Sequence, residues 1–333
     1  MNECPLVSVL IPCYNHEAFL GDCLCSLLAQ DYENMELLIC DDCSPDDSFG
    51  VIQSFESRLQ GRFPRSVILR NESNCGVTKN INRMLEMARG EYVKILASDD
   101  AMTPNAIGAM VSYLQQHPEM DVVVANGVKV SQTQHYPDFS GDEKIYTAAP
   151  DFSPQGFFAR VARCNEISAP AAMVRRSVYT KYGNYDEQVK VEDYEFWLRI
   201  LKDGNCRFGF LDEDLLFYRI SDNSMTSLVG NAGLAERRKR IFDSQLHTLN
   251  QYRNYLEKAE YAEIVLTRIF EERWLAVEYH LTDWEAELWV QWKQFSGWAD
   301  LPAGKRLRFR LYSGRQRIKK CLYRQKFAAK DRN

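Results

Sequence analysis

Three pairs of neighbouring acidic residues are the groups in this chain best suited to chemistry: Asp41-Asp42, Asp99-Asp100 and Glu192-Asp193. The first two pairs follow apolar runs typical of strands, and the third precedes an amphipathic helical pattern. Carboxylates gathered at one edge of a sheet repel one another unless a cation or a hydrogen-bonding ligand lies between them. We therefore expect the three pairs to line one rim, around a metal ion and a polar ligand.

The pair Asp99-Asp100 suits a metal ion best. Mg²⁺ and Mn²⁺ prefer carboxylate and phosphate oxygens, and one or two carboxylates together with a diphosphate often complete such a site. Each acidic pair taken alone has an ordinary alternative, because Asp is also common in turns and as a helix cap.

Other familiar chemistries lack their motifs. No GxGxxG follows the first expected strand and no Walker A sequence occurs, which excludes dinucleotide-dependent dehydrogenases and P-loop enzymes. Cys40 and Cys43 have C-x-x-C spacing, but no second Cys or His pair lies at ligand spacing. We therefore interpret the ten cysteines as reduced thiols. The five histidines show no ligand spacing either.

The elements that must position the acidic pairs follow from hydrophobic periodicity. Short apolar runs alternate with helical patterns through residues 7–125, which predicts βαβ units and a mainly parallel sheet. The expected strands are 7–11, 35–40, 67–69, 91–96 and 121–125. Helices lie between them, and Gly90 stands where a helix C-terminal cap is preferred.

The second half of the chain is patterned differently. Residues 131–155 are polar and aperiodic, so we expect a long loop over the carboxyl edge of the sheet and a candidate lid. Beyond it the pattern predicts a strand at 171–174, a helix at 193–201, a strand pair within 207–219 and helices over 232–298.

Composition and charge restrict the function classes. The 333 residues are 45% apolar and 26% charged, which is typical of a folded soluble protein, and the net charge of −5 argues against nucleic-acid binding. Residues 305–333 carry twelve Lys or Arg and one acid. This basic tail fits either a membrane-surface anchor or a helix docked on the acidic remainder. No secretion signal or membrane span is evident, so we expect a cytoplasmic protein.

Six motifs within residues 6–226 resemble glycosyltransferase family 2. They are VSVLIPCYN (7–15), LICDDCS (38–44), NCGV (74–77), GEYV (90–93), SDD (98–100) and EDYEFWLR (192–199). The resemblance implies an α/β fold of GT-A type, a Rossmann-like, mainly parallel sheet flanked by helices, here with a helical C-terminal extension. It also implies a nucleotide-sugar donor, expected to be a UDP-sugar, a Mn²⁺ or Mg²⁺ ion, and inversion at the anomeric carbon.

The resemblance also divides the chain. It implies a glycosyltransferase domain over 1–226, with a nucleotide-sugar-binding half (1–125) and an acceptor-binding half (126–226). A helical extension (227–304) and the basic tail (305–333) follow. The expected acceptor is a glycan or a polyprenyl-linked glycan of a bacterial polysaccharide pathway. In that setting the tail would place the enzyme peripherally at the inner leaflet of the membrane.

The resemblance also assigns nucleotide contacts to individual residues. Pro12, Tyr14 and Asn15 resemble the nucleobase and ribose pocket, with the Tyr14 ring as a stacking face. Asp42 would accept the uracil N–H, because an ionised carboxylate only accepts hydrogen bonds. Lys79 stands where the family often has Arg near the nucleotide, and a solvated lysine on a helix surface is the alternative.

The resemblance assigns the remaining roles to residues of the acidic motifs. Asp99 resembles the ribose contact and Asp100 the metal contact. Asp193 resembles the general base, with Glu192 as an orienting or capping residue and Asp41 in support. We expect Asp193 to stay ionised, because a helix N-terminus stabilises a carboxylate.

Two departures from the family pattern stand out. Ala97 replaces a frequent further Asp, and Ser221 stands where the late motif often has His, so an imidazole metal contact from that position is missing.

The rival hypothesis is a catalytically silent nucleotide- or sugar-binding scaffold of the same fold. A nucleotidylyltransferase is a third reading, but its glycine-rich, Arg-containing loop is missing after the first strand.

Overall fold

The computed structural model describes residues 4–221, 233–279 and 281–298. The chain divides into two compact units, Met1–Val229 and Gly230–Asn333, which we describe separately. The basic tail at 305–333, and with it the membrane-anchor hypothesis, lies outside the described residues.

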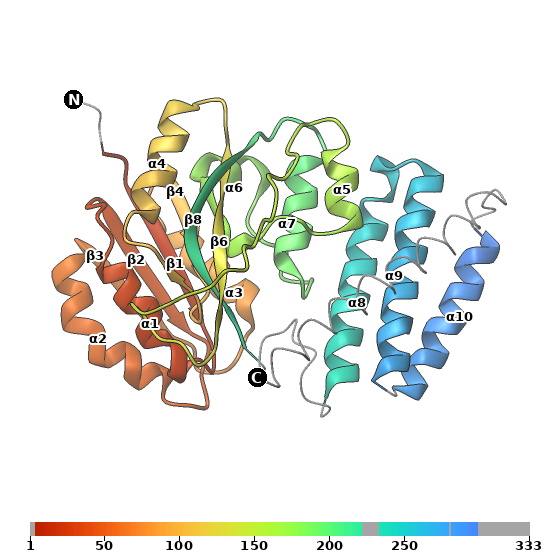
Figure 1. The fold of residues 1–333 in the computed structure, drawn as a ribbon, viewed down its shortest axis with the longest axis horizontal. Coiled ribbons are helices and arrows are strands. Elements are labelled where there is room, and N and C mark those ends of the chain that lie inside the picture. Colours follow the sequence, from red (N-terminus) through yellow and green to blue (C-terminus); the bar gives the residue numbers. More distant parts are fainter. Residues whose placement is uncertain (1–3, 222–232, 280, 299–333) are drawn as a thin grey trace. The chain divides into compact units, whose positions relative to one another are not determined.

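An eight-stranded sheet forms the centre of the first unit, in the order β3-β2-β1-β4-β7-β6-β8-β5 (Figure 1). The strands are β1 Val7–Cys13, β2 Met35–Asp41, β3 Arg65–Arg70, β4 Tyr92–Ile95, β5 Ala101–Met102, β6 Val122–Ser131, β7 Ala172–Arg175 and β8 Phe208–Ile220. Six of them share one direction, whereas β7 and β5 run antiparallel to their neighbours. The predicted mainly parallel α/β sheet is therefore confirmed.

Helices connect and cover these strands. They are α1 Glu17–Leu28, α2 Ser48–Arg62, α3 Val77–Met87, α4 Ala106–Gln116, α5 Phe157–Arg163, α6 Arg176–Tyr182 and α7 Glu192–Leu201. Every residue of β2 and nearly every residue of β1 is buried. Their near-continuous apolar runs fit strands covered on both faces. The shared direction brings the carboxyl ends of β1, β2 and β4 to one edge, where the candidate site lies.

The expectation that Gly90 caps a helix is wrong. Helix α3 ends at Met87, and Gly90 is not among the glycines with positive φ. Gly90 is instead packed against β1, where a Cβ would lie 2.5 Å from the backbone nitrogen of Ser8. Its amide also donates to the Ser8 hydroxyl at 2.8 Å. The glycine is therefore needed for close packing of the chain against β1.

The expected strand pair within 207–219 is a single strand, β8, which pairs with β6 in parallel over both of their lengths. The register shifts next to Asn126, which pairs with Asp214, while the preceding Ala125 pairs with Leu211. The polar run at 212–214 is thus absorbed as a bulge, and Asn126 donates to the Asp212 carboxylate at 3.0 Å. Because a bulge accommodates extra residues within one strand, no chain reversal is required.

The predicted long loop at 131–155 lies between β6 and α5. Part of it runs along β6, with Ile145 donating to Gly127 O at 2.8 Å and Lys129 donating to Glu143 O at 2.8 Å. The loop is thus fastened to the sheet at that point. Its role as a lid stays a prediction.

The second unit is helical where it is described, with α8 Leu234–Gln251, α9 Lys258–Glu278 and α10 Thr282–Trp298. Helix α9 packs against both of the others. Arg238 of α8 is paired with the buried Glu272 of α9. In the described part of the chain, no helix combines the length and apolar composition that crossing a membrane requires.

Candidate active site

Asp42, directly after β2, is enclosed by the loop that leads into α3. Its Oδ1 accepts hydrogen bonds from Asn71 Nδ2 and the Cys75 amide, both at 2.8 Å, and its Oδ2 accepts one from the Gly76 amide at 2.7 Å. The side chain is buried. Burial alone would raise the pKa of Asp42, but the hydrogen bonds from Cys75, Asn71 and Gly76 together lower it. Asp42 is therefore an ionised acceptor that also shapes the loop at 71–76.

Tyr14 and Asn15 follow β1 at the same edge. Tyr14 is 45% exposed, so its ring is open to a ligand, and Asn15 adopts a left-handed conformation with φ of 56°. The Asn15 amide donates to the Ser44 hydroxyl at 3.0 Å, which ties this turn to the loop after β2. Pro12, within β1, is partly exposed beneath the turn.

Asp41 precedes Asp42 in the chain, and Lys79 lies on α3, the helix that follows the loop at 71–76. Asp41 is fully buried, accepts a hydrogen bond from the Ser44 amide at 3.2 Å and lies 3.3 Å from Arg70 Nε. It therefore supports the loop after β2 from below. Lys79 is exposed on the first turn of α3 and acts electrostatically on Cys75, one of the donors to Asp42.

Asp99 and Asp100 follow β4 and differ in environment. The Asp99 side chain is 14% exposed and lies beside His16, with its Oδ2 3.9 Å from His16 Nε2. Asp100 is buried: its Oδ1 accepts the Arg219 amide at 2.9 Å, and its Oδ2 has no hydrogen-bond partner. Burial, followed by the neighbouring Asp99, raises the pKa of Asp100 well above its ordinary value.

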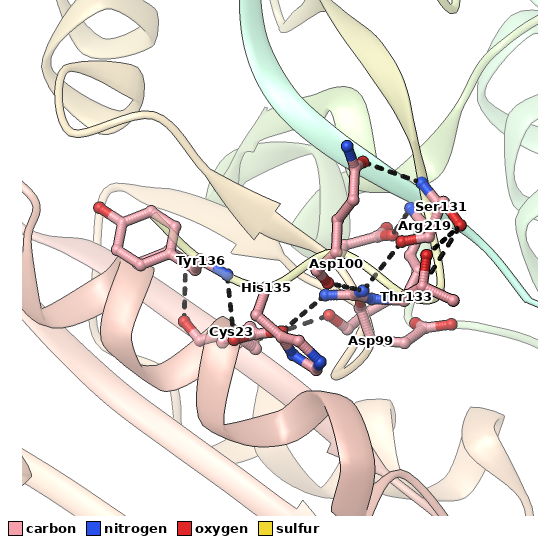
Figure 2. A network of polar contacts seen from close by, with 12 residues as sticks. Cys23, Asp99, Asp100, Ser131, Thr133, His135, Tyr136 and Arg219 are labelled. Carbon is pink, nitrogen blue, oxygen red and sulfur yellow. Dashed lines mark hydrogen bonds and ion pairs between the residues drawn. The ribbon is translucent and has the colours of Figure 1, made fainter. Parts of the chain in front are cut away.

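Arg219 of β8 joins the acidic pair to α1 and to the start of the 131–155 loop, within the network drawn in Figure 2. Its Nε donates to Asp99 O at 2.8 Å, and its guanidinium donates to Gln134 O at 2.6 Å and to the Asp22 carboxylate at 2.8 Å. Asp22 of α1 also accepts the Tyr136 amide at 3.1 Å. The side chain of Arg219 is fully buried. One cation thus holds α1, the turn after β4 and the start of the 131–155 loop together.

Asp193 lies in the first turn of α7, next to the segment that follows α5. Its Oδ2 accepts a hydrogen bond from Asn165 Nδ2 at 3.0 Å, and its Oδ1 accepts the Tyr194 amide at 2.6 Å. Glu192 precedes it and is partly buried. The helix cap position belongs to Val191, so the expectation that Glu192 could cap α7 is wrong.

The ionisation of this pair also differs from the prediction. Burial, followed by the neighbouring Asp193, raises the pKa of Glu192 to about 8. Burial also raises the pKa of Asp193, despite the hydrogen bonds from Tyr194 and Asn165 that lower it. Loss of solvation therefore outweighs the helix N-terminus that was expected to keep Asp193 ionised. A base with a pKa closer to neutrality is a stronger proton acceptor once it has lost its own proton.

The acidic pairs do not form one cluster of protein ligands. Within the described ranges, no group of three or more His, Cys, Asp or Glu side chains could hold a metal ion. The loop at 71–76 engages Asp42, whereas Asn165 engages Asp193.

A metal ion with few protein ligands nevertheless fits the residues present. The buried Oδ2 of Asp100 lacks a hydrogen bond, and the partly exposed Asp99 carboxylate lies beside it in the chain. One or two carboxylates are enough where a diphosphate and water supply the other ligands.

Sequence reasoning missed several residues of this site. Arg219 lies two residues before Ser221 of the late motif and was not singled out, and Asp22, His16 and Asn165 carried no signal that the sequence pattern could reveal. Lys94 does carry such a signal, because it is a lysine within the otherwise apolar strand β4. It is buried, and its Nζ donates to the carbonyls of residues 170 and 172. Burial lowers the pKa of Lys94 to about 7.

Comparison with known proteins identifies the family. The sequence model of the family described as Glycosyl transferase family 2 matches residues 8–183, which is more than half of the chain. The chain is 27% identical over 228 residues to EpsE of Bacillus subtilis (strain 168), named as a glycosyltransferase, covering 67% of this chain and 76% of EpsE. It is also 27% identical over 226 residues to WfgD of Escherichia coli, covering 67% of this chain and 80% of WfgD. WfgD is named UDP-Glc:alpha-D-GlcNAc-diphosphoundecaprenol beta-1,3-glucosyltransferase.

Solved structures support the fold. TarS 1-349 of S. aureus, in complex with UDP-GlcNAc, is similar with a TM-score of 0.56 and 21% identity, over 80% of this chain and 72% of TarS 1-349. The mannosyltransferase PcManGT of Pyrobaculum calidifontis, with GDP-Man and Mn²⁺, is similar with a TM-score of 0.53 and 15% identity, over 90% of this chain and 84% of that one. The expected GT-A architecture is thereby confirmed. With its matching family pattern and its named relatives, this chain belongs to glycosyl transferase family 2 and is a glycosyltransferase.

Proposed function

We propose that this glycosyltransferase transfers a sugar from a UDP-sugar to a hydroxyl group of a lipid-linked glycan, with inversion at the anomeric carbon. The observation that carries the proposal is the shared carboxyl edge, where the open Tyr14 ring, the ionised Asp42 and the Asp99-Asp100 pair follow β1, β2 and β4. The name of WfgD, which includes UDP-Glc and a diphosphoundecaprenol acceptor, and the UDP-GlcNAc complex of TarS support this choice of substrates.

Donor binding follows from the chemistry at this edge. The Tyr14 ring would stack on the nucleobase. Asp42 would accept the base N–H through Oδ2, which receives one hydrogen bond from the loop at 71–76, from the Gly76 amide. Asp42 is suited to this role because it is held in place by donors on its other sides. Asp99, partly exposed beyond the base, would face the ribose and diphosphate.

The diphosphate end would carry a divalent cation, held by the Asp99-Asp100 pair. When bound, such an ion neutralises the negative charge that develops on the departing nucleoside diphosphate. The chain itself contributes positive charge nearby, because Arg219 and the buried Lys94 both act electrostatically on Asp100. The Arg219 cation, together with Lys94 in its protonated form, stabilises an acidic pair that would otherwise be costly to bury.

Asp193 would act as the general base. The acceptor hydroxyl gives its proton to the Asp193 carboxylate while its oxygen bonds to the anomeric carbon. The bond from that carbon to the diphosphate oxygen breaks on the opposite face, and the nucleoside diphosphate leaves. Asn165 keeps one carboxylate oxygen in place through the hydrogen bond at 3.0 Å. General base catalysis of this kind contributes ~10²- to 10⁴-fold to the rate.

The substitution Asp193→Asn tests this function. It preserves the shape of the side chain but removes the proton acceptor, so transfer should fall by at least ~10²-fold while UDP-sugar binding, measured by calorimetry, stays intact. Nucleotide release is the readout, over a panel of UDP-sugars with a polyprenyl-diphosphate-linked acceptor and Mn²⁺. Full activity in Asp193→Asn would exclude Asp193 as the base. Binding of UDP-sugar without any turnover in the wild type would favour the silent scaffold.

The basic tail adds one test of the setting. We infer that residues 305–333, with their twelve basic side chains, bring the enzyme to the anionic inner leaflet where a lipid-linked acceptor resides. Co-sedimentation of the full chain with anionic vesicles should exceed that of a chain ending at residue 304. Equal co-sedimentation would reject the anchor.

A further inference from the structure

His16 is the N-terminal cap residue of α1, three residues after the end of β1, and its ring contacts the turn after β4. Its Nδ1 is 2.7 Å from the Ser98 hydroxyl, and its Nε2 is 3.9 Å from Asp99 Oδ2. Its backbone amide donates to the Ser48 hydroxyl at 2.9 Å, so the residue is fixed at both ends. The side chain is 28% exposed, which leaves the imidazole accessible from the edge of the sheet.

The contact with Ser98 bears on what the other ring nitrogen can do. The buried Ser98 hydroxyl can accept a hydrogen bond from Nδ1–H or donate one to Nδ1. In the tautomer that donates from Nδ1 to Ser98, Nε2 carries the lone pair and faces the Asp99 carboxylate. Metal-binding histidines commonly have this arrangement, with the second ring nitrogen held by a hydrogen bond that fixes the tautomer and the ring orientation.

The separation of His16 Nε2 from Asp99 Oδ2 favours a shared ion over a direct hydrogen bond. At 3.9 Å it exceeds hydrogen-bond distance. Two ligand atoms each ~2.1 Å from one octahedral ion lie between ~3.0 Å apart, in neighbouring positions, and ~4.2 Å apart, in opposite positions. The observed distance lies between these two values, so a small rotation of the two side chains would allow one ion to bind both atoms.

We propose that His16 Nε2 is a further ligand, beside the Asp99-Asp100 pair, of the divalent cation that accompanies the UDP-sugar, so that His16 supplies the imidazole that Ser221 does not. This inference rests on the proposed function, because the diphosphate must provide further ligands. Such a site needs few protein ligands, because the diphosphate and water supply the others. A nitrogen ligand also favours Mn²⁺ over Mg²⁺, because Mg²⁺ binds oxygen almost exclusively.

Pulsed electron paramagnetic resonance of Mn²⁺ tests the proposal on the full chain with UDP as the probe. A directly bound imidazole gives a ¹⁴N coupling to Mn²⁺ that carboxylate, phosphate and water cannot give. We expect this coupling in the wild type and its loss in His16→Gln. We also expect the Kd for Mn²⁺, measured in the presence of UDP, to rise at least ~10-fold in that variant.

His117→Gln is the matched control, because His117 is exposed at the end of α4 and pairs with Glu119. It should retain both the coupling and the Mn²⁺ affinity. Glutamine at 16 can still bond to Ser98, so unfolding temperatures of the variants should match the wild type. A coupling that persists in His16→Gln overturns the proposal.

Two further outcomes separate this inference from the proposed function. If the wild type binds Mn²⁺ with UDP but shows no ¹⁴N coupling, His16 is not a ligand, and the proposed transfer stands with an all-oxygen site. If the wild type binds UDP but no Mn²⁺, both the His16 site and the metal requirement of the proposed function are overturned.

Discussion

Replacing Arg219 by methionine should destabilise the first unit more than any single exposed ion pair could. The arginine side chain is fully buried and donates to the carbonyl oxygens of Asp99, Ser131 and Gln134 and to the Asp22 carboxylate. Its guanidinium also lies 4.7 Å from the centre of the Phe19 ring. Methionine has a similar length but neither the charge nor the donors, so these acceptors would lose their partner.

The expected loss of stability depends on the contacts that Asp22 retains after the substitution. Removing one member of a buried ion pair costs about 3–5 kcal/mol. Asp22 retains the Tyr136 amide at 3.1 Å and contact with His135 at 3.0 Å, so we take the lower end, about 3 kcal/mol. For a unit of 229 residues this corresponds to a fall in Tm of about 6–12 °C.

Thermal unfolding followed by near-ultraviolet circular dichroism measures this change. Arg240→Met is the control, because the pair that Arg240 forms with Glu236 is exposed, and its loss should cost under about 1 kcal/mol. A double-mutant cycle with Asp22→Asn isolates the ion pair and should give a coupling of at least about 1 kcal/mol. If Arg219→Met lowers Tm by no more than Arg240→Met, or the cycle is additive, the buried arginine does not hold these segments together.

Three further predictions concern the base and the packing of the sheet. Activity should rise with pH as Asp193 loses its proton, at a higher pH than for an ordinary aspartate because burial raises the pKa of Asp193. Glu192→Gln should shift this rise, because it removes the carboxyl group coupled to Asp193. An unshifted pH profile of kcat/KM would contradict the coupling. Asn165→Ala should lower kcat ~10-fold and leave the KM for the donor unchanged, because only Asp193 loses a hydrogen bond. A change in KM with an unchanged kcat would contradict the role of Asn165 in positioning Asp193. Gly90→Ala should destabilise the chain by about 1–3 kcal/mol, because its Cβ would lie 2.5 Å from a backbone nitrogen of β1. Gly61→Ala, which has open space around it, should not, and equal unfolding temperatures for the two variants would show that the space at Gly90 is not needed.

Much of the fold could be predicted from local pattern. The apolar runs that became β1 and β2 are buried on both faces, and a buried strand leaves a continuous apolar signature in the sequence. The amphipathic stripe of α7 was equally visible. The single strand β8 was missed because a bulge next to Asn126 absorbs polar residues that normally signal a turn. Gly90 was misassigned because the sequence does not distinguish a glycine needed for close packing from one needed for a positive φ.

The sequence by itself determined which side chains stand at the ends of the strands, because the order of strand, acidic pair and helix is a local property of the chain. Only the tertiary structure decided how those side chains are partnered and charged. Arg219 reaches Asp22 across 197 positions of the chain, and Asn165 reaches Asp193 across 28. Burial, which depends on everything packed around a group, raised the pKa of Glu192 and Asp193 against the local effect of the helix N-terminus. Solvation and long-range hydrogen bonds depend on distances in space, and the order of residues along the chain does not contain them.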